Sequence, residues 1–444
     1  MTSPVHDLRP AAAQAVPPAR RPHPSKLFVE VTTRCNLRCA MCVKYAPGQG
    51  LIEGDMTDET YERLAPAFPH LEALVLNGIG EPLLHRGLER FVARARADMP
   101  ATGWIGFQTN GQLIGERRAD SLVASGVDRI CISADAVSPE MLRQIHGGAR
   151  QSQIVVATEA LQHAAARHGR RLELGLEFVA MRSNLRELPL LVRWAADRGF
   201  AFLIVTHMLP YDASMTHEAA FAPTTDRALA LFEAWRMRGA AEGISLDDYR
   251  EPARFYPNDA ERRANELVRG MVDDASRQGI SLRIADLLAF DHGKVREVQA
   301  VFDEAATLAA ERGLDLKLPR TVPTQVRRCD FVEEGSAFVS WDGKLHPCYF
   351  LWHRFACHLA GISKLVEPRV LGAVADRPLL DIWNGPEWRS LRGEVTKYEF
   401  PFCYDCNLAL CDYVSEGEFE QDCHIGTVPC AACLWCTGPF QCLR

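Results

Sequence analysis

Three cysteines lie within eight residues near the start of the chain, in the sequence CNLRCAMC. Cys35, Cys39 and Cys42 are separated by three and then two residues, and they follow an apolar run that predicts a β-strand. Three thiolates on one loop can hold three corners of a cubane iron–sulfur cluster and leave the fourth iron open. A zinc site that borrows a distant ligand is the alternative, because zinc needs four ligands and no other Cys or His follows closely.

A second group of cysteines lies in the last quarter of the chain. No apolar leader segment begins the sequence, so we expect a reducing, cytoplasmic environment in which disulfides are disfavoured. Clusters of thiols in that setting indicate metal or iron–sulfur sites. A zinc ribbon built on two CxxC pairs is the alternative. The candidate ligands of this group are Cys329, Cys348, Cys403, Cys406, Cys411, Cys423, Cys430, Cys433 and Cys442.

Short apolar runs alternate with longer amphipathic segments in the first half of the chain. The short runs are rich in Val, Ile, Leu and Phe, which is typical of strands covered on both faces in a parallel sheet. Six such repeats predict an α/β fold with a partial (β/α)6 barrel of the TIM type, and a doubly wound sheet is the alternative. The predicted strands span residues 26–32, 73–78, 104–110, 129–135, 172–180 and 200–207.

Composition divides the chain into four parts. Residues 1–25 are rich in Pro, Ala and Arg and predict a flexible N-terminal arm. Residues 26–240 form the predicted barrel and residues 241–325 a helical connector. Residues 326–444 form a small Cys-rich domain, which buries too little surface to be stable alone and needs a metal or cluster.

The CxxxCxxC loop after the first strand resembles that of the radical S-adenosylmethionine (SAM) superfamily. The resemblance implies that Cys35, Cys39 and Cys42 hold a 4Fe–4S cluster whose open iron binds SAM. It also implies reductive cleavage of SAM to a 5′-deoxyadenosyl radical, which abstracts hydrogen from a substrate at the mouth of the barrel. Met41 stands where this family often has an aromatic residue, and its apolar side chain can still cover the adenine.

Later motifs extend this resemblance in the expected order. NGIGEP resembles the family's GGE element, in which Gly78, Gly80 and Glu81 would hold the SAM ammonium; glycines allow close backbone approach. Strand ends supply the other implied contacts to SAM. A simpler role is open for each of them. Asn110 can belong to a turn, Ser133 and Asp135 can be a solvated strand end, Asn184 can be a helix N-cap, and His207 can be a hydrogen-bonded core histidine. These residues are Asn110, Ser133, Asp135, Asn184 and His207.

The C-terminal region resembles the SPASM domain of radical SAM enzymes. Cys329, Gly343 and Cys348 follow its CX13GX4C opening, and the sequence IWNGPEW resembles a later segment. The resemblance implies one or two auxiliary 4Fe–4S clusters, with Cys357 and Cys436 as spare thiols. The final segment, CHIGTVPCAACLWCTGPFQC, is most similar to a subgroup of metalloenzyme maturases.

The predicted function is therefore radical chemistry on a substrate peptide, a protein or a metallocofactor precursor. An electron donor of the flavodoxin or ferredoxin type is the expected partner. A net charge of −7 argues against a nucleic-acid partner, and no apolar stretch reaches membrane-spanning length. Peptide crosslinking, a small-molecule or sugar substrate, and a non-catalytic electron carrier are alternatives. Candidates for a general acid or base are Glu177, His207, Tyr211 and Asp212.

Overall fold

A ten-stranded sheet organises the molecule. The computed structural model describes residues 16–48, 50–250, 256–359, 361–400, 430 and 433–443. The sheet has the order β12-β9-β8-β1-β2-β3-β4-β5-β6-β7. Strands β8 and β1 to β7 are parallel to one another, whereas β9 pairs antiparallel with both β8 and β12. Its strands are β1 (Lys26–Val29), β2 (Ala73–Val75), β3 (Trp104–Thr109), β4 (Arg129–Ser133), β5 (Glu173–Ala180), β6 (Phe202–His207), β7 (Asp315–Lys317), β8 (Ser336–Val339), β9 (Lys344–His346) and β12 (Gly372–Ala373).

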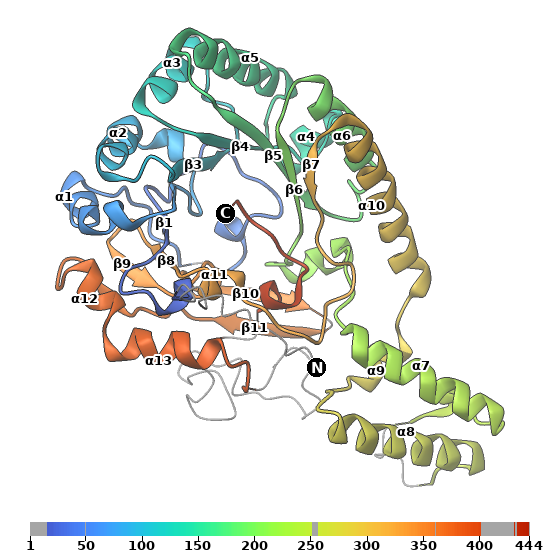
Figure 1. Ribbon diagram of the computed structural model, residues 1–444. Coiled ribbons are helices and arrows are strands. Elements are labelled where there is room, and N and C mark those ends of the chain that lie inside the picture. Colours follow the sequence, from blue (N-terminus) through green and yellow to red (C-terminus); the bar gives the residue numbers. More distant parts are fainter. Residues whose placement is uncertain are drawn as a thin grey trace, which may run out of the picture.

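Helices cover the outer face of the curved sheet, and the strands surround a central lumen (Figure 1). The described helices are α1 (Asp58–Glu62), α2 (Leu88–Asp98), α3 (Glu116–Ser125), α4 (Pro139–Ile145), α5 (Gln151–His168), α6 (Glu187–Asp197), α7 (Asp226–Ala241), α8 (Asp259–Arg277), α9 (Ile284–Leu288), α10 (His292–Arg312), α11 (Asp330–Glu333), α12 (Leu379–Trp383) and α13 (Pro386–Val395). Short 3-10 turns are η1 (Pro18–Arg20), η2 (Val43–Tyr45), η3 (Ala65–His70), η4 (Pro82–Leu84), η5 (Ala213–Glu218), η6 (Leu246–Asp248) and η9 (Trp435–Thr437).

All six predicted strands are present, and the predicted partial barrel is confirmed. Strands β7 and β12 are the two edges of the sheet, so the barrel stays open between them. Local sequence explains several element ends. Thr57 caps α1 by accepting a hydrogen bond from the Thr60 N–H, and α3 ends at Gly126 with a left-handed φ of 103°.

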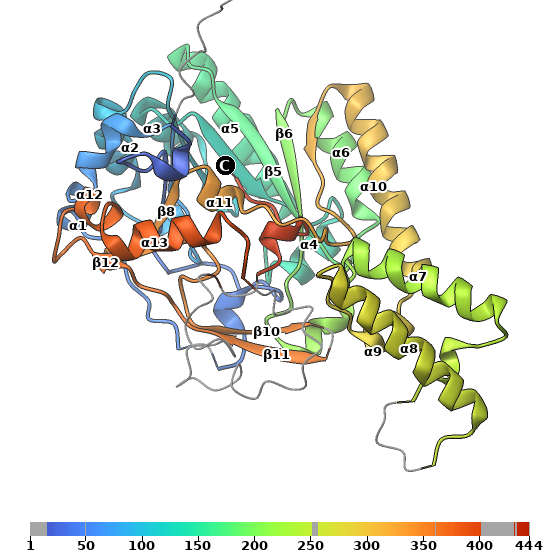
Figure 2. The same ribbon diagram turned by 60° about the horizontal axis from the view of Figure 1, so that its bottom comes forward.

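Residues that follow the predicted barrel segment, 26–240, add strands at both edges of the sheet. Helix α10 packs on α6, and β7 pairs with β6, so part of the segment predicted as a connector forms a seventh β/α unit. Strand β8 of the Cys-rich domain pairs in parallel with β1. The helices α7, α8 and α9 have their own small core and project from the side of the barrel (Figures 1 and 2).

The C-terminal segment enters the lumen of the barrel (Figure 1). Leu443 is buried there against the inward side chains of Phe28, Cys131, Ile204 and Phe338. A two-stranded antiparallel sheet of β10 (Phe355–Leu359) and β11 (Ile362–Val366) lies beside the barrel (Figure 2). None of the helices in the described residues combines the length and apolarity needed to cross a bilayer.

Candidate active site

The three-cysteine loop leaves the C-terminal end of β1 and is fixed by short contacts. The Cys42 N–H donates to the Cys39 carbonyl at 3.2 Å, and the Tyr45 hydroxyl donates to the Leu37 carbonyl at 2.8 Å. The Ala40 N–H donates to the carbonyl of Ile145 at the end of α4, 2.9 Å away. These bonds hold the three thiols in one compact turn.

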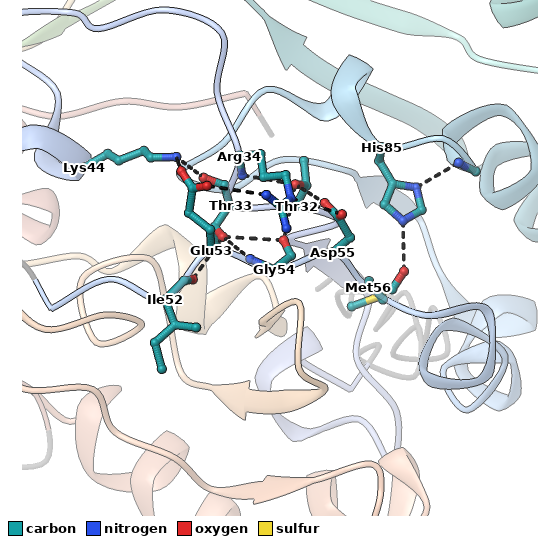
Figure 3. Close-up of polar contacts among 11 residues, drawn as sticks. Thr32, Thr33, Arg34, Lys44, Ile52, Glu53, Gly54, Asp55, Met56 and His85 are labelled. Atoms are coloured by element: carbon teal, nitrogen blue, oxygen red, sulfur yellow. Dashed lines mark hydrogen bonds and ion pairs between the residues drawn. The ribbon is translucent and has the colours of Figure 1, made fainter.

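A polar network fixes the base of this loop (Figure 3). The Thr33 hydroxyl donates to the Ile52 carbonyl at 3.1 Å and accepts from the Gly54 N–H at 2.8 Å. Lys44, which is 9 % exposed, donates to the Thr33 carbonyl and pairs with Glu53 at 2.7 Å. The network therefore links the loop to the chain that follows it, so the cysteines cannot shift independently.

Gly78 and Gly80 follow β2 and pack against β1 and the base of the loop. A Cβ on Gly78 would lie 2.3 Å from Glu30 Cγ, and one on Gly80 would lie 2.4 Å from the Thr32 carbonyl oxygen. The sequence prediction attributed these glycines to close approach of a ligand. The structure gives a second reason, because any side chain here would displace the cysteine loop.

Glu81 is buried and already has three hydrogen-bond donors. Its carboxylate accepts from the Thr109 hydroxyl at 2.7 Å, the Asn110 N–H at 2.7 Å and the Leu83 N–H at 3.1 Å. Burial raises the pKa of Glu81, and these donors oppose that shift. Glu81 thus joins the ends of β2 and β3 in addition to lining the site.

His146 is a site residue that the sequence prediction missed. Its Nδ1 lies 3.4 Å from Cys39 Sγ, and its Nε2 lies 2.9 Å from Asp135 Oδ2. His146 and Asp135 are 3 % and 0 % exposed. A Cβ on Gly147 would lie 2.2 Å from the Arg38 carbonyl, so α4 ends directly against the cysteine loop. The chain Asp135–His146–Cys39 orients one of the three thiols.

One cavity of about 350 Å³ collects most of the predicted residues. It lies at the C-terminal ends of strands β1 to β6, as expected for a barrel enzyme. Asn77 and Gln108, which the sequence prediction did not name, also line it, as does Glu177, a predicted acid–base candidate. The predicted residues that line it are Cys35, Cys39, Met41, Cys42, Gly78, Gly80, Glu81, Asn110, Ser133, Asp135 and His207.

Asn184 does not line this cavity and has a structural role instead. It is fully buried, and its side chain accepts from the Met181 N–H at 2.8 Å. The same side chain donates to the Asp135 and Val179 carbonyls, each at 3.0 Å. Helix α6 has Arg186, not Asn184, as its N-cap. Asn184 therefore connects the ends of β4 and β5 and positions Asp135.

Met41 belongs to a methionine-rich wall of the site. It packs in a cluster with Ile145 and with four further methionines, which are Met141, Met181, Met208 and Met215. Thioether side chains are flexible and polarisable, and they fit flat aromatic groups well. Of this cluster, Met41 and Met208 line the site and supply apolar surface there.

His207 and Tyr211 line the cavity, and Asp212 does not. Burial lowers the pKa of His207 to about 3, so its imidazole is neutral near pH 7. Its Nε2 lies 3.2 Å from the Arg320 carbonyl, which makes Nε2 the donor and leaves Nδ1 as an acceptor. Asp212 caps η5 by accepting from the Ser214 N–H at 2.8 Å.

A second cavity, of about 330 Å³, is lined by six thiols. Cys436 is one of them, although the sequence prediction named it a spare. Cys357, the other predicted spare, is 1 % exposed and does not line this cavity, although its apolar cluster also includes Cys433. The six thiols are Cys329, Cys348, Cys430, Cys433, Cys436 and Cys442. The predicted ligands Cys403, Cys406, Cys411 and Cys423 lie outside the described residues.

The opening of the Cys-rich domain folds as its sequence predicts. Strands β8 and β9 form an antiparallel hairpin, and the turn has Gly343 at a φ of 82°. Cys348 follows the return strand and Cys329 precedes α11, so the hairpin brings both thiols to the same cavity. In the described part of the chain, no disulfide joins any cysteines.

The two cavities share a wall made by the C-terminal segment. Cys442, Gln441 and Tyr349 line both of them. The Gln441 N–H donates to the Thr206 hydroxyl at 3.1 Å, and the Arg328 N–H donates to the Cys436 carbonyl at 2.8 Å. The C-terminal segment thus crosses the open side of the barrel and separates the two thiol sites.

The donor sets fit iron–sulfur clusters better than single ions. Among the described residues, no three His, Cys, Asp or Glu side chains converge closely enough to hold one metal ion. Instead, four thiols line the first cavity and six line the second, with Cys442 shared by both, and sets of several cysteines of this kind suit multi-iron clusters. Burial raises the pKa of Cys35 and Cys39 and raises that of Cys42 to about 11, so cluster binding must release protons.

Comparisons with known proteins agree with this arrangement. The sequence profile of the Radical SAM superfamily matches residues 29–169, and that of the SPASM iron–sulfur cluster-binding domain matches residues 329–407. A tungsten-containing aldehyde ferredoxin oxidoreductase cofactor-modifying protein of Pyrococcus furiosus is 24% identical over 94% of this chain and 96% of its own length. A PqqA peptide cyclase of Xanthomonas campestris is 27% identical over 66% of this chain and 77% of its own.

Two further proteins resemble either one part of this chain or its fold alone. A GTP 3',8-cyclase of Caulobacter vibrioides is 31% identical over 41% of this chain and 51% of its own length. The crystal structure of SuiB from Streptococcus suis bound to S-adenosylmethionine has a TM-score of 0.50 over 83% of this chain and 68% of SuiB, at 11% identity. This structural likeness concerns the fold.

Fold and site together define an iron–sulfur enzyme built on a partial (β/α) barrel. The chain belongs to the radical SAM superfamily and carries a C-terminal SPASM domain. SAM and iron–sulfur clusters are its cofactors, and when bound they supply a carbon radical through one-electron cleavage of the sulfonium. The chain itself positions them: Cys35, Cys39 and Cys42 would hold the cluster, and the glycine-containing loop after β2 would face the SAM methionine group.

Proposed function

We propose that this enzyme abstracts hydrogen from a substrate during the maturation of a metalloenzyme or its cofactor. The observation that carries the proposal is the meeting of Cys35, Cys39 and Cys42 with the loop of Gly78 and Gly80 at one cavity. The likeness to the Pyrococcus furiosus cofactor-modifying protein supports the substrate class, because it spans nearly all of both chains.

Radical modification of a ribosomally made peptide is the second candidate. The likeness to a PqqA peptide cyclase supports it. The cavity supports it further, because none of its described lining residues is Lys or Arg, the residues that bind phosphorylated small molecules. A sugar or another small molecule is a less supported substrate. We place the enzyme in the cytoplasm, with a flavodoxin or ferredoxin as electron donor.

The test replaces one cluster ligand. Cys42→Ala is expected to abolish formation of 5′-deoxyadenosine from SAM and dithionite, because two thiolates do not hold the cubane. The iron in the C-terminal domain is expected to remain, since its six described thiols line a separate cavity. Cys357→Ala is the matched control, because Cys357 lines neither cavity. Undiminished cleavage by Cys42→Ala would contradict the assignment of Cys42 as a cluster ligand. No cleavage by the wild type with full clusters would favour a non-catalytic electron carrier.

A further inference from the structure

Three polar side chains, from the loop after β2 and from β3 and β5, form a connected row in the cavity. The Asn77 amide donates to Gln108 Oε1, and the Gln108 amide donates to Glu177 Oε2. All three residues line the cavity that also contains the cysteine loop. No motif in the sequence connects them, and the roles assigned to SAM binding do not include them.

The direction of hydrogen bonding in this row follows from its last member. An ionised carboxylate only accepts, so Gln108 must turn its NH₂ group toward Glu177. Its carbonyl oxygen then faces Asn77, which must donate in turn. Each amide therefore donates one of its two N–H groups within the row, and the row leaves an acceptor at each end.

Both remaining acceptors lack partners in the described part of the chain. Asn77 is 8 % exposed, and its Oδ1 is buried without a hydrogen bond. Glu177 Oε1 accepts no hydrogen bond from any described residue, and the side chain is partly accessible through the cavity. A buried acceptor without a donor destabilises the protein, and a bound ligand with N–H groups would remove that penalty.

The charge of the cavity favours the same ligand. Glu81, Asp135 and Glu177 line it, and no described lining residue is Lys or Arg. Glu81 and Asp135 have donors or a histidine beside them, whereas Glu177 has one amide donor. Burial and the nearby Asp135 raise the pKa of Glu177 to about 7, as expected for a carboxylate that lacks a cation.

We propose that Asn77, Gln108 and Glu177 form the substrate-recognition site, and that they bind a cationic amine carried by a peptide. Glu177 would pair with the ammonium, and Asn77 Oδ1 would accept a second N–H. The proposal rests on the proposed function and narrows its substrate class. It disfavours a nucleoside triphosphate, since the described wall of the cavity offers phosphate groups no cation.

Binding of matched peptides to the full-length, cluster-loaded protein tests this inference. The probes are acetyl-Ala-Lys-Ala-amide, acetyl-Ala-norleucine-Ala-amide, Ala-norleucine-Ala-amide with a free amino terminus, and GTP, each measured by anaerobic equilibrium dialysis with SAM present. A probe with an ammonium is expected to bind about tenfold more tightly than acetyl-Ala-norleucine-Ala-amide, because the charged pair is shielded from water. The lysine and free-terminus peptides distinguish a side-chain amine from an N-terminal one.

Two substitutions test which side chains bind the ammonium probe. Glu177→Gln keeps the shape of the side chain but removes its charge, so the preference for ammonium is expected to fall below about twofold. Asn77→Leu tests the other acceptor if Glu177→Gln folds poorly. Glu159→Gln, on the exposed side of α5, is the matched control and should behave as the wild type.

SAM affinity should stay within about twofold in these variants, because the proposed contacts belong to the substrate. Equal binding of the ammonium and norleucine peptides by the wild type, or tighter binding of GTP, overturns the inference. A preference that survives in both variants, or no peptide binding at all, also overturns it. Failure of the proposed function would appear separately, as absence of 5′-deoxyadenosine.

Discussion

Replacing Gly80 by alanine tests whether the loop after β2 sets the position of the cysteine loop. The added Cβ would lie 2.4 Å from the Thr32 carbonyl oxygen and 2.6 Å from that of Arg34, whereas ordinary contact begins at 3.4 Å. The segment that contains Gly80 and the segment that contains Thr32 must therefore move apart by about 1.0 Å, the difference between 3.4 Å and 2.4 Å. The same shift strains the hydrogen bond from the Glu81 N–H to the Arg34 carbonyl, which is 2.7 Å long.

The two effects of this variant differ in size. Overpacking of this kind lowers the free energy of unfolding by about 1–3 kcal/mol. A displacement of 1 Å at the site is expected to slow 5′-deoxyadenosine formation roughly 100-fold. Gly393→Ala is the control, because no atom lies within 4 Å of its added Cβ in α13, and it should raise stability by about 0.5–1 kcal/mol.

Urea denaturation and a timed assay of 5′-deoxyadenosine measure these effects. The reasoning is refuted if Gly80→Ala keeps the wild-type rate, since the cysteine loop would then tolerate the displacement. A lower rate with no change in iron content would place the fault in SAM binding and not in cluster assembly.

Three further outcomes follow from the structure. Leu443→Ala should lower the free energy of unfolding by about 2–5 kcal/mol in urea titrations, because it leaves a cavity in the lumen; an unchanged midpoint would contradict this packing. Cys348→Ala should reduce the iron bound per chain, whereas Cys357→Ala should not, and equal iron contents would argue against the six-thiol cavity. Because folding raises the pKa of Glu177 from 4.5 to about 7, its contribution to apoprotein stability is lost as pH rises between these values. The stability of Glu177→Gln should therefore change less over that range, and identical pH profiles would contradict the shift.

Much of the site could be predicted because its residues lie in short motifs at strand ends. The spacing of Cys35, Cys39 and Cys42 by itself predicts an iron–sulfur cluster. Gly80 lies in a motif that is expected directly after the second strand. The parallel strands bring those ends to one edge of the sheet, so order along the chain predicts proximity in space.

Other features depend on contacts that no local pattern encodes. His146 ends a short helix without any motif, and it belongs to the site because α4 packs on the cysteine loop. Asn184 was predicted to contact SAM, but two backbone carbonyls and one N–H surround its side chain. Strand β7 is three residues long, too short for periodicity to reveal.

Gln441 hydrogen-bonds to Thr206, 235 positions earlier in the sequence, and the nearby Leu443 is buried in the barrel lumen. During synthesis on the ribosome, the strands β1 to β6 emerge long before the side chain that completes their interior. Until the C-terminal segment has been made, the interior of the barrel is therefore unfilled, and Cys442 is absent from the wall that the two cavities share.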